Sequence, residues 1–170
     1  MSERGGLKQI LERRRALFEK KPEAARYNPT AVTEWKGGLL NENRIRTHIL
    51  MSDYPVPSGG ADTAANPMEL VLAALGSCVS AVFVEYAALM EIALESVKVE
   101  LSGQIDLRGL FNVADVNSGF NEISYTVTIK APDVDEARMA ELIRLAGEHC
   151  PVSSTLKLNT PVASRVTVER

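Results

Sequence analysis

Cysteine, histidine and tryptophan are scarce in this 170-residue sequence, which has two cysteines, two histidines and one tryptophan. Two thiols are too few for a disulfide framework or a four-thiolate metal site, and we expect neither a metal nor a cofactor. The opening segment MSERGGLKQILERRR lacks an apolar run before its charges, which argues against a secretory signal. The sequence therefore predicts a cytoplasmic protein whose thiols are free, and either redox-active or merely buried.

The sequence also lacks a strong excess of positive charge and an apolar run long enough to cross a membrane. The formal net charge is -3 at pH 7, so the whole protein does not attract nucleic acid or an anionic membrane. The basic run Arg13, Arg14 and Arg15 is flanked by Glu12 and is expected to be a solvated helix face. The uncharged stretch 70–84 covers 15 residues, short of the roughly 18 to 20 that cross a bilayer. We expect neither nucleic acid nor a membrane as a partner.

What is present is the composition of a globular domain. Apolar residues make up 45% of the sequence and charged residues 24%, in a chain long enough to bury a core. Residues 1–30 are predicted to form a helical arm, with a helix at 4–21, and a polar connector; residues 31–170 form the main domain. Its predicted elements are strands 31–36 and 44–51, a loop 53–65, a helix 67–90, strands 97–102 and 123–130 around a loop 108–119, a helix 133–149 and a strand 161–168.

This order favours a mixed α+β domain with one antiparallel sheet covering its helices. The helix at 67–90 has a well-marked start, because Asn66 can cap it, Pro67 suits its first position and Glu69 can reach back to the cap N–H. Apolar residues run nearly all the way round this helix. It is therefore expected to be buried on most sides, either within its own domain or against a partner chain.

The two cysteines stand in different local settings. Cys78 follows Gly76 in the apolar helix, where the glycine can let another helix pack closely and the cysteine can be a small buried side chain. Cys150 precedes Pro151, which ends one helix and suits the first turn of the next. Cys150 would then face a helix N-terminus, a setting that lowers a thiol pKa. His149 and His48 are expected to be ordinary surface or capping residues.

Spacing alone does not join thiols that are 72 positions apart. The run NPMELVLAALGSC, ending at Cys78, resembles the first-cysteine signature of the osmotically inducible protein C / organic hydroperoxide resistance (OsmC/Ohr) family, and HCPVS around Cys150 resembles its second. The match in order and spacing starts at about Ala31 and leaves residues 1–30 uncovered. The resemblance implies an intertwined homodimer, with curved antiparallel sheets around two central helices and the cysteines meeting at the subunit interface.

The same resemblance implies a thiol-dependent peroxide reductase acting on organic hydroperoxides. In peroxide-reducing members, the first cysteine attacks the hydroperoxide as a thiolate and becomes a sulfenic acid. The second condenses with it to a disulfide, which an external dithiol reduces. Carried over to this sequence, Cys78 attacks and Cys150 resolves, in line with the oxidation chemistry of cysteine. The two sulfur atoms are then expected to lie close enough to bridge.

One departure from the family pattern concerns the acid that precedes the first cysteine. The peroxidases of the family have a glutamate ten residues before that cysteine, and this position is Met68 here. Glu69 is one residue further on, rotated about 100° around the helix. Glu69 is a candidate for the missing role, and its capping function is the alternative. Met68 also motivates a second hypothesis, a non-catalytic dimeric protein that binds an apolar small molecule and has structural or regulatory thiols.

The other departure concerns the activating cation. Apolar surroundings raise the pKa of a thiol in mid-helix, so Cys78 needs a positive partner to become a nucleophile. The family peroxidases use an arginine from the first hairpin, and the turn expected to carry it reads KGGLL here. Arg44 and Arg46, or Lys36, are the available substitutes. These departures resemble a less characterised, OsmC-like branch of the family.

Overall fold

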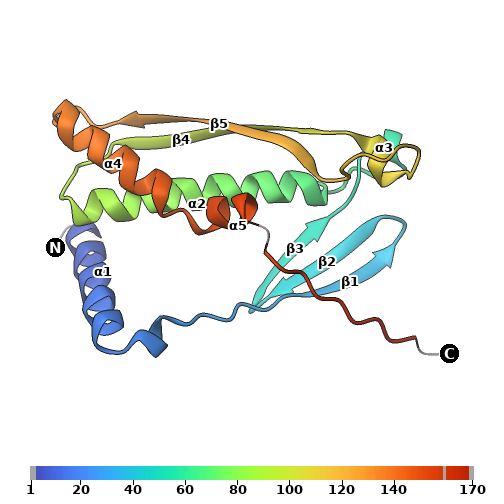
Figure 1. The fold of residues 1–170 in the computed structure, drawn as a ribbon, viewed down its shortest axis with the longest axis horizontal. Coiled ribbons are helices and arrows are strands. Elements are labelled where there is room, and N and C mark those ends of the chain that lie inside the picture. Colours follow the sequence, from blue (N-terminus) through green and yellow to red (C-terminus); the bar gives the residue numbers. More distant parts are fainter. Residues whose placement is uncertain (1–2, 159, 169–170) are drawn as a thin grey trace.

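The computed structural model describes residues 3–158 and 160–168 of the chain (Figure 1). The helices are α1 (Glu3–Lys20), α2 (Pro67–Leu89), α3 (Leu107–Leu110), α4 (Glu136–Glu148) and α5 (Pro151–Lys157), with 3-10 turns η1 (Pro22–Ala25) and η2 (Val56–Ser58). The strands are β1 (Val32–Gly37), β2 (Leu40–Ile45), β3 (His48–Ser52), β4 (Ser96–Ile105) and β5 (Phe120–Lys130). The mixed α+β class is confirmed, and the three long helices lie within a few residues of their predicted positions.

The strands form two separate antiparallel sheets in this chain, whereas the sequence led us to expect one. The order is β1-β2-β3 in the first sheet and β4-β5 in the second. The predicted strand 44–51 is divided between β2 and β3, because the chain reverses at Arg46, whose φ is +56°. The short helix α3 occupies the first residues of the predicted loop 108–119. Alternation of apolar residues marks a face of a strand but does not say which strand it pairs with.

The predicted strand 161–168 is wrong for this chain, since the segment 160–168 carries no strand assignment. Its valines are exposed, and Val162 retains 92% of its accessible surface. An alternating pattern becomes a strand only when a sheet edge receives it. No edge of the described part of this chain does so.

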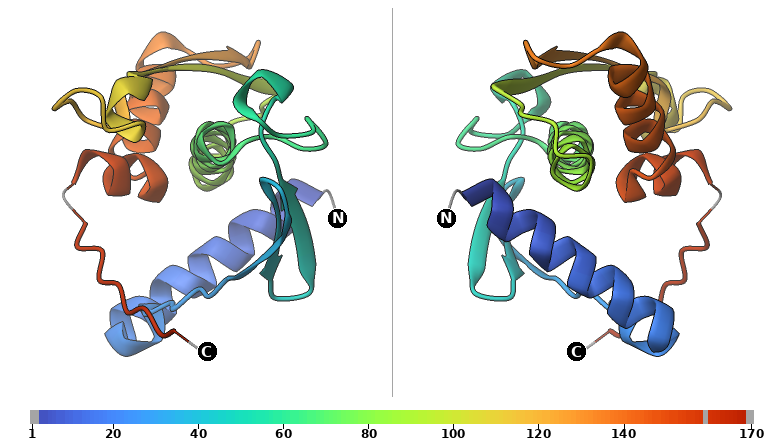
Figure 2. Two further views of the ribbon diagram at one scale, coloured as in Figure 1. Left: turned by 90° about the vertical axis from the view of Figure 1, so that its right-hand side faces the viewer. Right: turned by 90° about the vertical axis from the view of Figure 1, so that its left-hand side faces the viewer.

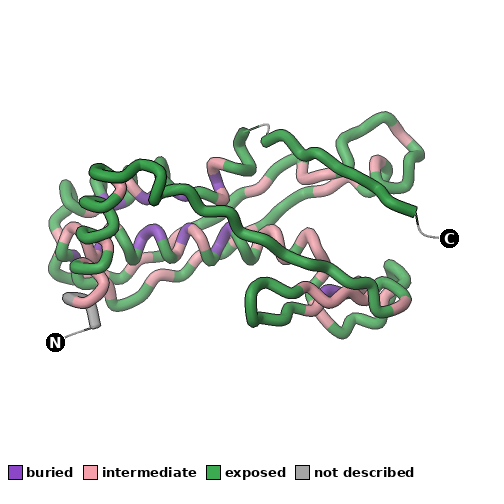
Figure 3. Tube along the Cα trace, turned by 90° about the horizontal axis from the view of Figure 1, so that it is seen from below, coloured by how far each residue is buried: buried purple, intermediate pink, exposed green. Residues whose placement is uncertain are grey.

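The core lies along one face of α2. Strands β4 and β5 run along this helix on one side, and α4 and α5 pack beside it (Figures 1 and 2). The buried apolar cluster consists of Leu75, Val79, Val82, Phe83, Ala87, Ile92, Leu142, Ala146 and Cys150. Figure 3 shows that buried residues concentrate on α2 and the helices beside it, while the tail and most of the three-stranded sheet are exposed. The other face of α2 is uncovered, at Ala73, Ala74, Ser77, Ala81 and Val84.

By length and composition alone, α2 is apolar enough to cross a membrane, with a mean hydropathy of 1.9 over its best window. The uncharged stretch 70–84 therefore underestimates the length of the apolar helix, because the helix continues past the single charge of Glu85 to Leu89. Central helices of water-soluble proteins meet the same criterion. Here α2 is the helix against which the other elements of the core pack.

The local features predicted for α2 are present. The side-chain oxygen of Asn66 accepts hydrogen bonds from the N–H groups of Met68 and Glu69, and the Glu69 carboxylate accepts one from the Asn66 N–H at 2.8 Å. The close approach at Gly76 is made by a strand and not by another helix. A Cβ on Gly76 would lie 2.7 Å from a methyl carbon of Leu101 in β4.

The loop that leads into α2 is organised by one buried carboxylate. Asp53 is 1% exposed, and its oxygens accept hydrogen bonds from the backbone N–H groups of Tyr54, Ala61 and Thr63 and from the Thr63 hydroxyl. The Thr63 N–H, followed by the Tyr54 N–H and the Thr63 hydroxyl, holds the pKa of Asp53 below its ordinary value. Ionisation of this carboxylate therefore strengthens the hydrogen bonds that tie both ends of the loop together.

We predict that Asp53→Asn destabilises the protein more at pH 7 than at pH 3. Because the pKa of Asp53 is lower in the folded than in the unfolded chain, its stabilising contribution is present above about pH 4 and is lost as the pH falls through the folded-state pKa. Urea unfolding midpoints of the variant and the wild type at both pH values measure this. Asp115→Asn, which changes an exposed carboxylate, is the matched control. A deficit of equal size at both pH values would contradict the prediction.

Candidate functional site

The two cysteines meet although they are far apart in the sequence. The sulfur atoms of Cys78 and Cys150 lie 3.3 Å apart, so the expected approach within bridging range is confirmed. Both are free thiols; Cys150 is 1% exposed and Cys78 is half-buried. A disulfide needs a separation of about 2 Å, so only a small displacement separates the two thiols from a bond.

The break between α4 and α5 places Cys150. Pro151 has no N–H to continue α4, and it occupies the first turn of α5, with Cys150 in an extended conformation at the N-cap. This matches the predicted helix start. The side chain of Cys150, however, makes no capping hydrogen bond. The backbone N–H of Val152 instead hydrogen-bonds to the sulfur of Cys78.

The surroundings of Cys78 keep it protonated in the isolated chain. Burial raises the pKa of the Cys78 thiol above its ordinary value, and the neighbouring Cys150 thiol and Glu85 carboxylate raise this pKa further. The Val152 N–H acts in the opposite direction but does not outweigh burial. No cation is among these principal influences in the described part of the chain. A positive charge supplied from elsewhere would favour the thiolate of Cys78.

Two of the predicted basic residues lie on strands of the three-stranded sheet, Lys36 on β1 and Arg44 on β2, and Arg46 lies at the turn between β2 and β3. Figure 1 shows this sheet apart from α4 and α5. Lys36 pairs with Glu34 at 2.6 Å, and Arg44 pairs with Glu42 at 2.7 Å. Arg46, at the turn between β2 and β3, has no ion pair with another described residue. The structure thus brings none of the three to Cys78 within one chain, and Arg46 is the one whose charge is uncompensated.

The remaining predicted residues fall outside the thiol contact. Glu69 is nine positions from Cys78, which places it about half a turn round α2 from the thiol, and its carboxylate is engaged in the capping box. His149 ends α4 through a contact of its Nδ1 with the Leu145 carbonyl oxygen at 2.9 Å, and its ring lies 5.4 Å from that of Tyr86. His149 therefore has the capping role expected of it.

A pocket of about 500 Å³ opens one helical turn from the thiols. We call it the α2–α5 pocket: it is lined by Met68, Val71 and Leu75 of α2, by the first half of β5, and by Ser153, Leu156 and Lys157 of α5. Leu75 precedes Cys78 by three positions and Ser153 follows Cys150 by three, so each lies one turn from a sulfur. Sequence reasoning missed this pocket, although the helical spacing of Met68, Val71, Leu75 and Cys78 was readable.

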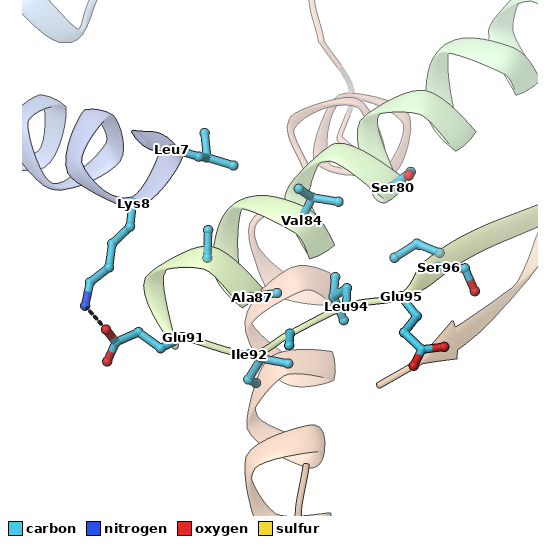
Figure 4. Close-up of a pocket in the computed structure, with 13 residues that line it drawn as sticks. Leu7, Lys8, Ser80, Val84, Ala87, Glu91, Ile92, Leu94, Glu95 and Ser96 are labelled. Atoms are coloured by element: carbon cyan, nitrogen blue, oxygen red, sulfur yellow. Dashed lines mark ion pairs between the residues drawn. The ribbon is translucent and has the colours of Figure 1, made fainter. Parts of the chain in front are cut away.

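A second cavity of about 500 Å³ lies at the other end of α2 and contains neither sulfur (Figure 4). Leu7 and Lys8 of α1 form one wall, and the Lys8 ammonium pairs with Glu91 at 2.9 Å. Val84 and Ile92 line the opposite side. Among the described residues, no group of three or more His, Cys, Asp or Glu side chains is placed to hold a metal ion.

Comparison with known proteins identifies the family of this chain. Residues 59–165 match the family described as OsmC-like protein. The organic hydroperoxide resistance protein OhrB of Bacillus subtilis (strain 168) is 26% identical over 135 residues, covering 78% of this chain and 93% of OhrB.

Solved structures share the fold at lower identity. An OsmC-like protein from Mycoplasma pneumoniae superposes with a TM-score of 0.62 at 21% identity, covering 78% of this chain and 87% of the other. An organic hydroperoxide resistance protein OsmC from Legionella pneumophila gives a TM-score of 0.58 at 22% identity, covering 79% and 93%. With the match to more than half of its length, this chain belongs to the OsmC-like protein family.

Proposed function

We propose that this protein is a thiol-dependent reductase of organic hydroperoxides, in which Cys78 is the attacking and Cys150 the resolving cysteine. The 3.3 Å approach of the two sulfurs is the observation that carries this proposal. A relative named for organic hydroperoxide resistance, 26% identical, supports the choice of oxidant. We place the reaction in the cytoplasm, with an external dithiol as the reductant and residues 1–30 as an arm outside the catalytic domain 31–170.

The proposed reaction balances with one hydroperoxide and one dithiol. The Cys78 thiolate attacks an oxygen of the O–O bond, the bond breaks, and the alcohol leaves with a proton while Cys78 becomes a sulfenic acid. The Cys150 sulfur then attacks the Cys78 sulfur, the S–O bond breaks, and water leaves as the disulfide forms. Thiol–disulfide exchange with the external dithiol restores both thiols.

The position of Cys150 protects the sulfenic acid from further oxidation. A second hydroperoxide must diffuse in, whereas the Cys150 sulfur is already in contact with that of Cys78. Burial of Cys150 at 1% exposure also keeps the resolving thiol away from bulk oxidant. Disulfide formation is thereby favoured over sulfinic acid, from which an ordinary dithiol does not recover the thiol.

The functional unit in this proposal is an intertwined homodimer. The three-stranded sheet projects from the body of the chain and leaves Trp35 71% exposed, and a small sheet without a core to cover is marginally stable (Figure 2). The uncovered face of α2, with Ala73, Ala74 and Ala81, is apolar and made of small side chains. Two copies that cross at α2 and lay the sheet of one over the body of the other would cover both surfaces.

The homodimer also supplies the missing cation. The sheet that one copy lays over the other carries Arg46 at its turn, with a guanidinium that no described residue neutralises. An arginine beside Cys78 stabilises the thiolate and lowers the thiol pKa. We propose Arg46 as this residue, with Arg44 second because Glu42 already compensates its charge. Glu69, engaged in its capping box, then has no direct part in the chemistry.

A non-catalytic binding protein for an apolar small molecule is the second candidate. Met68 favours it, because a methionine stands at the position of the family glutamate and lines the α2–α5 pocket. In that case the thiols are structural or regulatory. Unchanged thiol titres after hydroperoxide treatment, together with an apolar ligand retained on purification, would select this function over the reductase.

We expect reduced wild-type protein to lose two thiols per chain when treated with an alkyl hydroperoxide and to turn over when a dithiol is present. Cys78→Ser abolishes both reactions because the attacking sulfur is absent. Cys150→Ser still consumes one hydroperoxide and accumulates a sulfenic acid, which mass spectrometry detects after trapping. Ser77→Ala, a neighbour of Cys78, serves as the control and retains turnover. Undiminished turnover in Cys78→Ser would eliminate the proposal.

The activating role of Arg46 is tested by the reactivity of Cys78 in a Cys150→Ser background. Arg46→Gln is expected to raise the pKa of Cys78 by about one unit, which lowers its alkylation rate at pH 7 about tenfold. Rates measured with iodoacetamide from pH 6 to pH 10 give the pKa directly. Arg26→Gln, in the connector, is the control. An identical pH profile for the Arg46 and Arg26 variants would show that the cation is another residue.

The dimer is tested by sedimentation velocity. Wild-type protein is expected to sediment as a dimer at micromolar concentration. Ala81→Arg places an unpaired charge in the proposed contact of the two α2 helices, and should weaken association by more than about a hundredfold. Thr126→Arg, on an exposed position of β5, leaves the dimer intact. A monomeric wild type, or an Ala81→Arg variant that remains dimeric, would contradict the proposal.

A further inference from the structure

The charges of this protein are divided unevenly between the arm and the main domain. Residues 1–30 carry eight Lys or Arg and four Asp or Glu side chains, whereas residues 31–170 carry eleven and eighteen. The arm therefore has an excess of four positive charges and the domain an excess of seven negative charges. The net charge of the whole chain conceals this separation, which is typical of a basic segment that meets an anionic surface.

Most cations of the arm are not neutralised by carboxylates. Its first turns are tied to the body, because the Lys8 ammonium pairs with Glu91 at 2.9 Å. Beyond that point, six basic residues are exposed and have no ion pair with any described residue: Arg13, Arg14, Arg15, Lys20, Lys21 and Arg26. On the sheets and on α4, by contrast, carboxylate partners are present for Lys36, Lys98, Lys130 and Arg144. The arm thus offers its positive charge to a partner.

Part of this charge flanks an exposed apolar strip on α1. Ile10 and Leu17 are 50% and 44% exposed, and they are seven positions apart, so they lie on one side of the helix. At 100° per residue, Arg13 and Lys20 lie within about 60° of this strip on one edge, and Arg14 lies within about 60° on the other. We call the surface formed by these five residues the basic ridge of α1.

The basic ridge faces away from the contact between α1 and the body of the chain. Figure 1 shows α1 projecting from the end of α2, and Figure 4 shows Lys8 reaching Glu91 just beyond that end. Lys8 precedes Ile10 by two positions and is therefore rotated about 200° from it. Glu12 and Glu19 follow the two apolar ridge residues by two positions each, so the acids also lie on the side opposite to the ridge.

An apolar strip edged by cations fits the surface of an anionic lipid bilayer. The apolar side chains can enter the boundary between head groups and acyl chains, while the arginine and lysine side chains at the edges reach the phosphate groups. A nucleic acid would bind the cations but would leave Ile10 and Leu17 in water. The negative domain is repelled by an anionic surface, so contact with it is confined to the arm.

We propose that the basic ridge of α1 docks this protein on anionic phospholipid membranes, with the helix lying in the plane of the head groups. The net charge of the whole chain argued against a membrane partner, and the basic run of the arm was expected to be a solvated helix face. Both expectations change once the charges are placed on the structure. The docking surface lies outside the family match at 59–165 and does not depend on the thiol chemistry.

Sedimentation with vesicles tests the proposal on the full chain. Wild type is expected to bind vesicles of phosphatidylglycerol and phosphatidylcholine, not vesicles of phosphatidylcholine alone, and binding should weaken as salt is added. Arg13→Gln/Lys20→Gln should weaken binding at least about tenfold, because each cation near an anionic surface contributes about fivefold. Arg13→Lys/Lys20→Arg should bind as wild type. Lys98→Gln/Lys130→Gln, which removes two charges from exposed positions of β4 and β5, is the control and should also bind as wild type.

The apolar strip distinguishes a lipid surface from other anionic partners. Ile10→Ala/Leu17→Ala keeps good helix formers and should weaken binding to the mixed vesicles about tenfold. Failure of wild type to bind these vesicles, or equal binding by this variant, would overturn the proposal. So would binding of duplex DNA in place of vesicles, or a weaker dimer in place of weaker vesicle binding, which would assign the ridge to a second copy. Cys78→Ser should bind as wild type, so failure of the proposed reductase leaves this test intact.

Discussion

The contact between Cys78 and Cys150 depends on a helix that cannot continue. Pro151 interrupts the hydrogen bonding that would extend α4, and the chain turns there to begin α5. Cys150 occupies this corner, facing the third turn of α2. Leu142 and Ala146 of α4 belong to the same buried cluster as the core side of α2, so apolar packing fixes the distance between the two helices. The contact between the thiols is in this way a property of the hydrophobic core.

The two sulfur atoms are close enough to react with each other, but within the described residues no positive charge beside Cys78 favours its thiolate. The sulfurs are in contact and the Val152 N–H hydrogen-bonds to Cys78, yet burial keeps the pKa of Cys78 raised. The charges that can correct this lie on a sheet that does not pack on its own core. In the proposed homodimer, the separation of Cys78 and the activating arginine onto different parts of the chain would make the reactivity of the thiol depend on dimer formation.

The helices could be predicted from the sequence because their signals are local. Asn66, Pro67 and Glu69 specify the start of α2 through hydrogen bonds within four residues, and the structure contains each of those bonds. Strand pairing was not predictable in the same way. The segment 44–51 became parts of two strands, and 161–168 found no partner, since pairing depends on residues remote in the sequence.

For the candidate site, the residues suggested the helix start at Cys150 but not the meeting of the two thiols. That expectation came from the family resemblance, since spacing does not encode a contact across 72 positions. The hydrogen bond from the Val152 N–H to Cys78 and the α2–α5 pocket could not be predicted, because both form where α5 packs against α2. Met68 was read as a missing acid, and the structure shows it as part of an apolar wall.

Gly76 shows how much can depend on an absent side chain. Leu101 of β4 places a methyl carbon in the space that a Cβ would need, so any other residue at 76 requires the Leu101 side chain to shift. Cys78 is two residues away on the same helix. A large residue at 76 would crowd Leu101 at this turn of α2. In the proposed reductase, a resulting change in the gap between the sulfurs would alter the competition between resolution and irreversible over-oxidation. Under that proposal, a position without a side chain would influence how the protein withstands its own substrate.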